Sequence, residues 1–299
     1  MTIISILIFI FVFVLGAITG AISNVTSGGA GVLTTYVLVQ YGNLTFQQSV
    51  GTVLAASAII VLVGGIEFYR KKLVDSQLAI TVGLSGVVAA FLAARESAVI
   101  RSVELEHAFG AFTLIVAAFT AFRVARARKK KFGSYFAIGR NKSTASPIVR
   151  GLPDGGAPNA LDYRMANSME ESTRWRGKDP LAITVQCAFG VTIGIITGLF
   201  GVGGAGLTMV VLLSVFKLKS NLLLGTSLMA SFFRYAGGAL GDLSTGLINT
   251  EFFILLVAGG AIGSVIGARF VIKRTKDIYV RLIIIGLLLF VSYHFLTAH

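Results

Sequence analysis

Arg234 is the residue of this sequence whose type and position point most directly to chemistry. It lies within residues 222–241, an apolar segment that is long enough to cross a bilayer and contains no acidic residue. A charged side chain in a membrane helix costs roughly 2.5–3.5 kcal/mol even on lenient insertion scales, so such residues usually face a cavity or a substrate path. We therefore expect Arg234 to bind an anion. The alternatives are a side chain that reaches the interface, or one that ties helices together through backbone carbonyls.

Hydroxyl side chains accompany this arginine in a pattern that occurs twice. Ser231 lies three residues before Arg234, hence on the same helical face, and Thr226 lies five residues before Ser231. Thr52 and Ser57 have the same spacing in the first half of the chain. We expect these four hydroxyls to line the anion site, although such side chains also commonly bond to their own helix backbone.

Two glycine-rich breaks, residues 23–31 and 201–206, each precede a short apolar segment, 31–42 and 205–217. At about 1.5 Å per residue, a dozen residues cover little more than half of a hydrocarbon core of roughly 30 Å. A helix that begins at such a break presents unpaired N–H groups and a positive dipole end, and glycine permits close approach of a ligand. Elsewhere, the glycines are expected to permit close helix packing. The break residues assigned to the anion site are Asn24, Thr26, Ser27, Gly28, Gly29, Gly203 and Gly204.

The composition fixes the class of protein that must position these residues. The chain has 299 residues, of which 55% are hydrophobic and 13% are charged. This is typical of an all-α polytopic membrane protein. The apolar segments lie at 3–22, 31–42, 46–66, 76–94, 105–123, 181–200, 205–217, 222–241, 250–270 and 278–296.

The sequence offers little for catalysis or metal binding. Cys187 is the single cysteine, and we find no cluster of His, Cys, Asp or Glu within the segments. We therefore expect no enzyme activity, no metal site and no cofactor. Glu251 lies at a segment end, so we also expect no buried carboxylate, which argues against a carboxylate-based proton relay.

A basic linker divides the chain into residues 1–124, 125–179 and 180–299. The linker is rich in Lys and Arg and includes the sequence RARKKK at 126–131. The net charge of the whole chain is +13. Next to a membrane helix, such a cluster suits anionic lipid of the inner leaflet, and nucleic-acid binding is a poor alternative. We expect the linker to be cytoplasmic.

The two membrane halves resemble each other at an offset of 174 residues, which brings Gly51, Thr52 and Ser57 into register with Gly225, Thr226 and Ser231. The sequence GAITG at 16–20 likewise resembles GIITG at 194–198. Lys and Arg accumulate in cytoplasmic loops, and this rule places the two halves in opposite orientations with both termini extracytoplasmic. The pattern predicts two inverted repeats, each a glycine-rich broken helix or helical hairpin plus three transmembrane helices.

The sequence GLFGVGGAG at 198–206, followed by a short apolar piece and LGTSL at 224–228, resembles the sulfite exporter TauE/SafE family of membrane transporters. The resemblance covers both halves and implies movement of small sulfur-containing anions, such as sulfite or organosulfonates, across the plasma (inner) membrane. The first break is more polar than the second, which favours a substrate with more hydrogen-bonding groups than sulfite.

We interpret the chain as a secondary transporter, and in the first instance an exporter, of a small sulfur-containing anion. It would work by alternating access around a midplane site formed by the two breaks. An anion channel would share the same electrostatics but would conduct continuously. A symporter for another small solute is the remaining alternative, and a cationic Arg234 would oppose a cationic substrate there.

Overall fold

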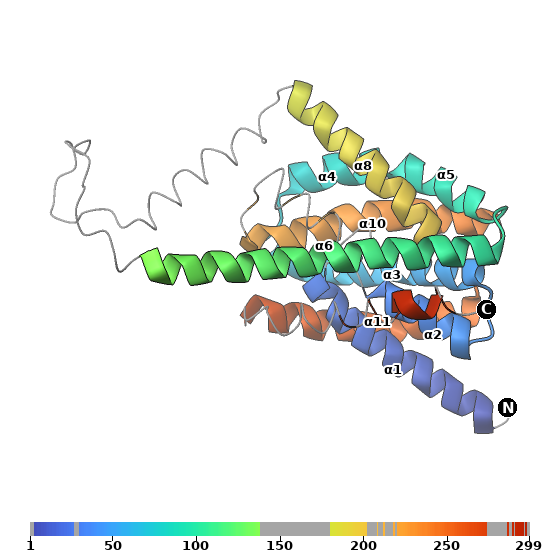
Figure 1. The fold of residues 1–299 in the computed structure, drawn as a ribbon. Helices are drawn as coiled ribbons and strands as arrows, with labels where there is room; N and C mark the ends of the chain where they lie inside the picture. The colour runs from blue at the N-terminus through green and yellow to red at the C-terminus, as the bar shows by residue number, and fades with distance from the viewer. Residues whose placement is uncertain are drawn as a thin grey trace, which may run out of the picture.

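The computed structural model describes residues 3–26, 30–137, 180–201, 208, 212, 218, 220–273, 286, 289, 291–295 and 297. The elements of this part are all helices, which confirms the predicted all-α class (Figure 1). Five spans within it are long and apolar enough to cross a membrane. The helices are α1 (Ile3–Thr26), α2 (Gly31–Tyr41), α3 (Phe46–Arg70), α4 (Ser76–Ser85), α5 (Val87–Ser97), α6 (Ser102–Ala137), α8 (Pro180–Phe200), α10 (Ser220–Ser244) and α11 (Thr250–Lys273).

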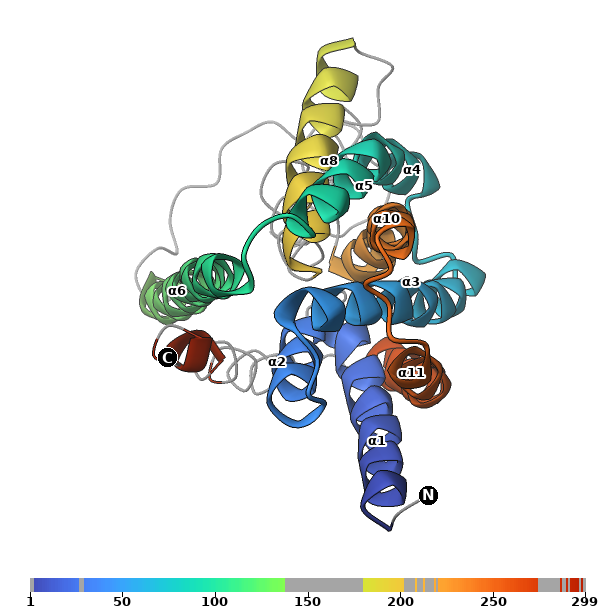
Figure 2. The same ribbon diagram turned by 90° about the vertical axis from the view of Figure 1, so that its right-hand side faces the viewer.

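Helices α3 and α10 form the centre of the molecule (Figure 2). They run antiparallel: Gly51 of α3 packs against Asp242 near the end of α10, and Gly225 near the start of α10 packs against Phe68 near the end of α3. A capping box at Thr45 and Gln48 fixes the start of α3. The predicted Arg234 segment thus lies in a 25-residue helix that is buried along most of its length.

The flanking helices pack across the two halves of the chain. Helix α1 lies along α11, whereas α8 lies along α5 and α4 (Figure 2). Glycines set both contacts, because Gly20 meets the backbone of Gly260 and Gly194 meets the backbone of Gly86 so closely that neither has room for a Cβ atom. The predicted packing role of Gly86 and Gly260 is confirmed, one at each interface.

Two breaks shape the first half. Helix α2 has 11 residues, which confirms the predicted short helix after the first glycine-rich stretch. The predicted apolar segment 76–94 falls within a single span, Ser76–Ser97, that is long enough to cross a membrane, and Gly86 divides this span into α4 and α5. Gly86 N–H bonds to the Gly83 carbonyl, a tighter turn than that of an α-helix. The second predicted short segment, 205–217, lies outside the described residues except for Thr208 and Leu212.

Helix α6 continues to Ala137, past the expected start of the linker at residue 125. Residues 138–179, which include most of that linker, lie outside the described part of the chain. An aromatic cluster holds α6 to α3 and to the C-terminal residues. In it, the Phe46 ring lies 5.3 Å from the Phe109 ring and 5.6 Å from the Phe295 ring.

Candidate functional site

Arg234 is fully buried, with 0% of its surface exposed, and its guanidinium contacts three parts of the chain. Nη2 donates to the Thr208 hydroxyl at 2.6 Å and to the Ser231 hydroxyl at 3.1 Å. Nη1 donates to the Val82 carbonyl of α4 at 3.3 Å. Ser231 therefore lies beside Arg234 as its spacing predicts, and Thr208 joins them from the segment after the second break.

The guanidinium keeps donor capacity that these contacts do not use. A guanidinium has five N–H groups, and Arg234 donates three hydrogen bonds. Nε is buried and has no hydrogen-bond partner, and no described carboxylate forms an ion pair with Arg234. A buried charge without a counterion is expensive, so this arrangement favours an anionic ligand. The bonds to Val82 and Thr208 also tie helices together, as the alternative interpretation of Arg234 expects.

The break between α4 and α5 makes room for the Arg234 side chain. A Cβ atom on Gly86 would lie 2.7 Å from Arg234 Cδ and 2.5 Å from the Gly190 carbonyl oxygen. The absence of a side chain at residue 86 thus allows α5, α8 and the arginine stem to meet at one point. Gly86 could not be assigned to the site from the sequence alone, because single glycines are frequent in membrane helices.

A small cavity lies between α1, α2 and α3 of the first half and α11 of the second half. Its accessible volume is about 10 Å³, room for a single water-sized group. Ser57, predicted as a site residue, lines it and is partly exposed. Three further hydroxyls that the sequence interpretation did not use also line it, together with apolar neighbours: Thr19, Ser23, Gly31, Thr34, Val53, Ala56, Ile60 and Leu256.

Thr52 and Thr226 do not join Arg234 but hold the loops that precede two helices. The Thr226 hydroxyl accepts a 2.9 Å bond from Asp75 N–H, and the Thr52 hydroxyl accepts a 2.9 Å bond from Asn249 N–H. Thr52 also donates to the Gln48 carbonyl at 2.7 Å. Both threonines are fully buried. Their predicted role as flanking ligands stays a prediction.

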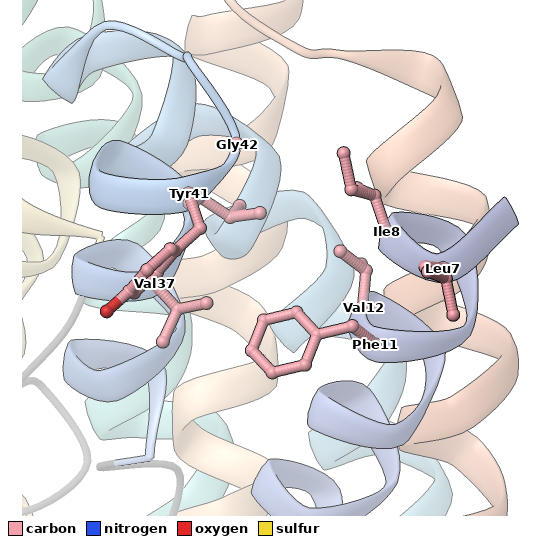
Figure 3. A pocket seen from close by; sticks show the side chains of 8 residues that line it. Leu7, Ile8, Phe11, Val12, Val37, Tyr41 and Gly42 are labelled. Atoms are coloured by element: carbon pink, nitrogen blue, oxygen red, sulfur yellow. The ribbon is translucent and has the colours of Figure 1, made fainter. Parts of the chain in front are cut away.

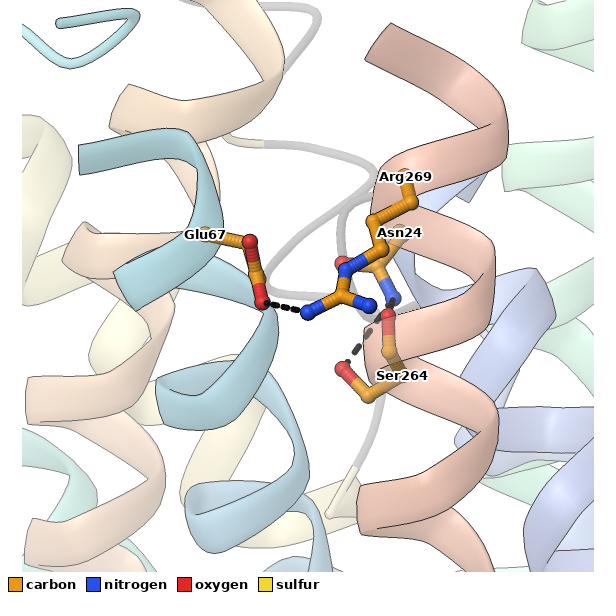
Figure 4. Close-up of polar contacts among 4 residues, drawn as sticks. All are labelled: Asn24, Glu67, Ser264 and Arg269. Carbon is orange, nitrogen blue, oxygen red and sulfur yellow. Dashed lines mark hydrogen bonds and ion pairs between the residues drawn. The ribbon is translucent and has the colours of Figure 1, made fainter. Parts of the chain in front are cut away.

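Asn24 is buried against α11 rather than beside Arg234 (Figure 4). Its Nδ2 donates to the Ser264 carbonyl at 2.8 Å and to the Ser264 hydroxyl at 3.1 Å, while its Oδ1 has no partner. Near this end of α3, an exposed Arg269 pairs with Glu67 at 3.2 Å. The side chain of Thr26, and the residues Ser27, Gly28, Gly29, Gly203 and Gly204, lie outside the described part of the structure.

The sequence interpretation missed two buried acids: Asp75, which caps α4, and Asp242. Asp242 lies in α10, just past the predicted segment end, with 0% of its surface exposed and no hydrogen-bond partner for either carboxylate oxygen. The expectation that no carboxylate is buried in the membrane segments is therefore wrong. The available signal was its spacing: Asp242 lies one turn beyond Gly238, and both residues pack against α3.

A larger groove between α1 and α2 is unsuited to an anion (Figure 3). Its volume is about 610 Å³, and its lining contains no charged residue. Phe11 and Tyr41 face each other across it, with ring centroids 6.4 Å apart. The remaining lining residues are Leu7, Ile8, Val12, Val37, Leu38 and Gly42.

The model of the sulfite exporter TauE/SafE family matches residues 12–295, nearly the whole chain. The chain belongs to this family. It is a multi-pass membrane transporter and not an enzyme.

Two curated relatives in Bacillus subtilis (strain 168) are similar to the chain over most of its length. The probable membrane transporter protein YdhB is 22% identical over 88% of this chain and 89% of its own length. The probable membrane transporter protein YunE is 22% identical over 90% and 91%, respectively. No solved structure matches the chain. Neither name specifies a substrate, so the TauE/SafE transporter's ligand must be argued from its own residues.

Proposed function

We propose that this TauE/SafE protein is a secondary transporter that exports a small sulfur-containing oxyanion, such as sulfite or an organosulfonate. The observation that carries the proposal is Arg234, a fully buried guanidinium with an unpartnered Nε and no described counterion. A planar guanidinium matches the paired oxygens of an oxyanion, and the buried site would strengthen the attraction. The hydroxyls of Ser231 and Thr208 hold the guanidinium in place.

We further propose that the two halves are inverted repeats. Support comes from contacts that recur 174 residues later with the partners exchanged. Thr226 bonds Asp75 N–H, and its counterpart Thr52 bonds Asn249 N–H. Asp75 and Asn249 are themselves counterparts, and each side chain accepts a bond at the start of the following helix.

The packing contacts follow the same rule and refine the predicted register. Gly20 packs on Gly260, and their counterparts Gly194 and Gly86 pack on each other. In this pairing, residue 20 corresponds to residue 194. The similar sequences instead align residue 16 with residue 194, so the two alignments differ by about one helical turn. The antiparallel α3 and α10, themselves counterparts at this offset, further support the inverted arrangement.

Alternating access is the mechanism that we propose for this arrangement. Exchange of the two repeats' conformations would expose Arg234 first to one side of the membrane and then to the other. An inside-negative potential favours exit of an anion by about 2.3 kcal/mol per charge per 100 mV, so export requires no coupling ion. The assigned orientation places the linker in the cytoplasm and both termini outside.

Counterflow in proteoliposomes tests this proposal. Vesicles preloaded with unlabelled methanesulfonate or sulfite should accumulate the labelled anion through the wild-type protein, and Arg234→Gln should abolish the accumulation. Arg269→Gln is the matched control, because this arginine is exposed and pairs with Glu67. Counterflow by Arg234→Gln at the wild-type rate would contradict the proposal. Anion flux without counterflow would favour a channel.

A symporter for another solute is the second candidate. Flux of a neutral or cationic solute that is unaffected by sulfur oxyanions would favour it.

A further inference from the structure

We propose that Asp242 is a proton-binding site whose occupancy is linked to anion binding at Arg234. This inference rests on the proposed function for the identity of the anion, but the proton site itself stands on the geometry of α10. Asp242 and Arg234 are eight residues apart on the same helix, which places them about 12 Å apart along its axis.

Among the described residues, none that touches Asp242 offers its carboxylate a hydrogen bond or an ion pair. Both carboxylate oxygens are buried without a hydrogen-bond partner. Helix α3 approaches through Gly51, where a Cβ atom would lie 3.1 Å from Asp242 Cβ and 3.2 Å from its Cγ. The Leu247 N–H of the following turn bonds to the backbone carbonyl of Asp242, not to its carboxylate.

The nearest charged side chains on the neighbouring elements are exposed, and none that the structure describes forms an ion pair with this carboxylate. Helix α5 packs against the adjacent Gly241 and carries Arg95 and Glu96, both exposed, and α11 begins near Glu251, which is also exposed. Helix α3 carries no charged residue from Phe46 as far as Glu67. No described residue forms an ion pair with Asp242.

The protonated form of Asp242 is therefore the one that suits this conformation. An ionised carboxylate in such a place loses its hydration without compensation, whereas the neutral acid loses far less. A conformation that opens the α3–α10 contact would hydrate the carboxyl group and release one proton to water. Proton uptake and release would then accompany the conformational cycle.

Electrostatics links this proton to the transported anion. An anion at Arg234 repels an ionised Asp242, so the anion and the proton favour each other's binding. Two charges about 12 Å apart in a protein environment interact strongly enough to change an affinity about tenfold. The sign follows directly: anion affinity is highest when Asp242 is protonated and falls as the pH rises through its titration.

Asp242→Asn tests the linkage because asparagine resembles the neutral acid and cannot titrate. Methanesulfonate is the suitable probe, since its charge does not change with pH. We expect the wild-type Kd to rise about tenfold between acidic and alkaline solution, and the Kd of Asp242→Asn to stay near the acidic value. Asp75→Asn is the matched control: Asp75 is buried but bonded to Leu78 N–H, and asparagine preserves this cap.

Infrared spectroscopy of the purified protein separates this inference from the proposed function. We expect the wild type to show a protonated carboxyl band that disappears in Asp242→Asn and persists in Asp75→Asn. Absence of that difference, or wild-type pH dependence in Asp242→Asn, would overturn the inference. Failure of the wild type to bind any sulfonate would overturn the proposed anion while leaving the infrared test of Asp242 intact.

Discussion

Two regions of the molecule share corresponding hydroxyl side chains but differ in charge at one corresponding position. The small cavity, lined mostly by the first half, and the Arg234 cluster in the second half are related by the offset of 174 residues. Where the second region has a guanidinium, the first has an isoleucine and a water-sized space. The corresponding pairs are Thr34 and Thr208, Ser57 and Ser231, Ile60 and Arg234, and Leu256 and Val82.

The difference indicates that both regions contain the repeated hydroxyls, whereas, of these two regions, the one on α10 also contains a charged side chain. The same holds nearer the end of the helix, where Asp242 corresponds to Phe68 of α3. Both substitutions replace an apolar side chain by a buried ionisable one on the same helix. We therefore interpret α3 as the packing partner and α10 as the helix that handles the transported charge.

The strongest way to break this comparison is to make the two regions alike. Arg234→Ile places the residue of the first region into the second. We expect sulfonate affinity to fall by at least about 30-fold, because removing one partner of a buried charged contact costs roughly 2–5 kcal/mol. Isothermal titration measures the loss. Wild-type affinity in Arg234→Ile would show that charge at position 234 is irrelevant to binding. Ile60→Arg in the wild-type background is the reciprocal variant.

The two glycine interfaces involve no charged residue, so an added methyl group should destabilise both to a similar extent. Gly20→Ala and Gly194→Ala each add a methyl group against backbone, at Gly260 and Gly86 respectively. We expect each variant to lose about 1–3 kcal/mol of stability, the usual range for overpacking. Thermal unfolding in detergent compares them. Gly246→Asn is the control, since that position has positive φ and open space. Strongly unequal losses would argue against equivalent interfaces.

The corresponding serines Ser231 and Ser57 should show a smaller difference in their effect on anion affinity. Ser231→Ala removes a 3.1 Å bond to the guanidinium, and Ser57→Ala removes a hydroxyl that faces the small cavity. We expect the first to weaken sulfonate binding several-fold, because a hydrogen bond to a charged group contributes roughly 1.5–3 kcal/mol and Thr208 retains part of the positioning. Ser57→Ala should change affinity less than twofold. The reverse order would place the ligand in the first region.

The smallest expected effects belong to the paired threonines. Thr52→Val and Thr226→Val each remove a 2.9 Å bond that satisfies a backbone N–H ahead of a helix. We expect each to lower the free energy of unfolding by about 1 kcal/mol, with little change in anion affinity. Chemical denaturation in detergent checks the first expectation and titration the second. A large affinity loss in either variant would return the threonine to the ligand site.

Much of the fold follows from the sequence because length and hydropathy decide which segments can be membrane helices. The 11-residue α2 and the burial of Arg234 were predictable in this way. The repeated threonines were found because a duplicated contact preserves its residues, although their crosswise bonds depend on tertiary packing. Asp242 was missed because an apolar segment is taken to end at a charge, and only the approach of Gly51 reveals that this acid is enclosed. The helix break at Gly86 was missed because a single glycine within an apolar segment does not by itself indicate a break.

The most direct test of the account is a binding screen of purified protein by thermal shift, with wild type, Arg234→Gln and Arg269→Gln measured in parallel. The ligands are sulfite, thiosulfate, sulfate, taurine, sulfoacetate and carboxylate analogues. We predict that at least one sulfur oxyanion raises the Tm of the wild type and of Arg269→Gln but not of Arg234→Gln. Equal stabilisation of all three proteins, or no response to any anion, would contradict the assignment of Arg234 as the anion-binding residue.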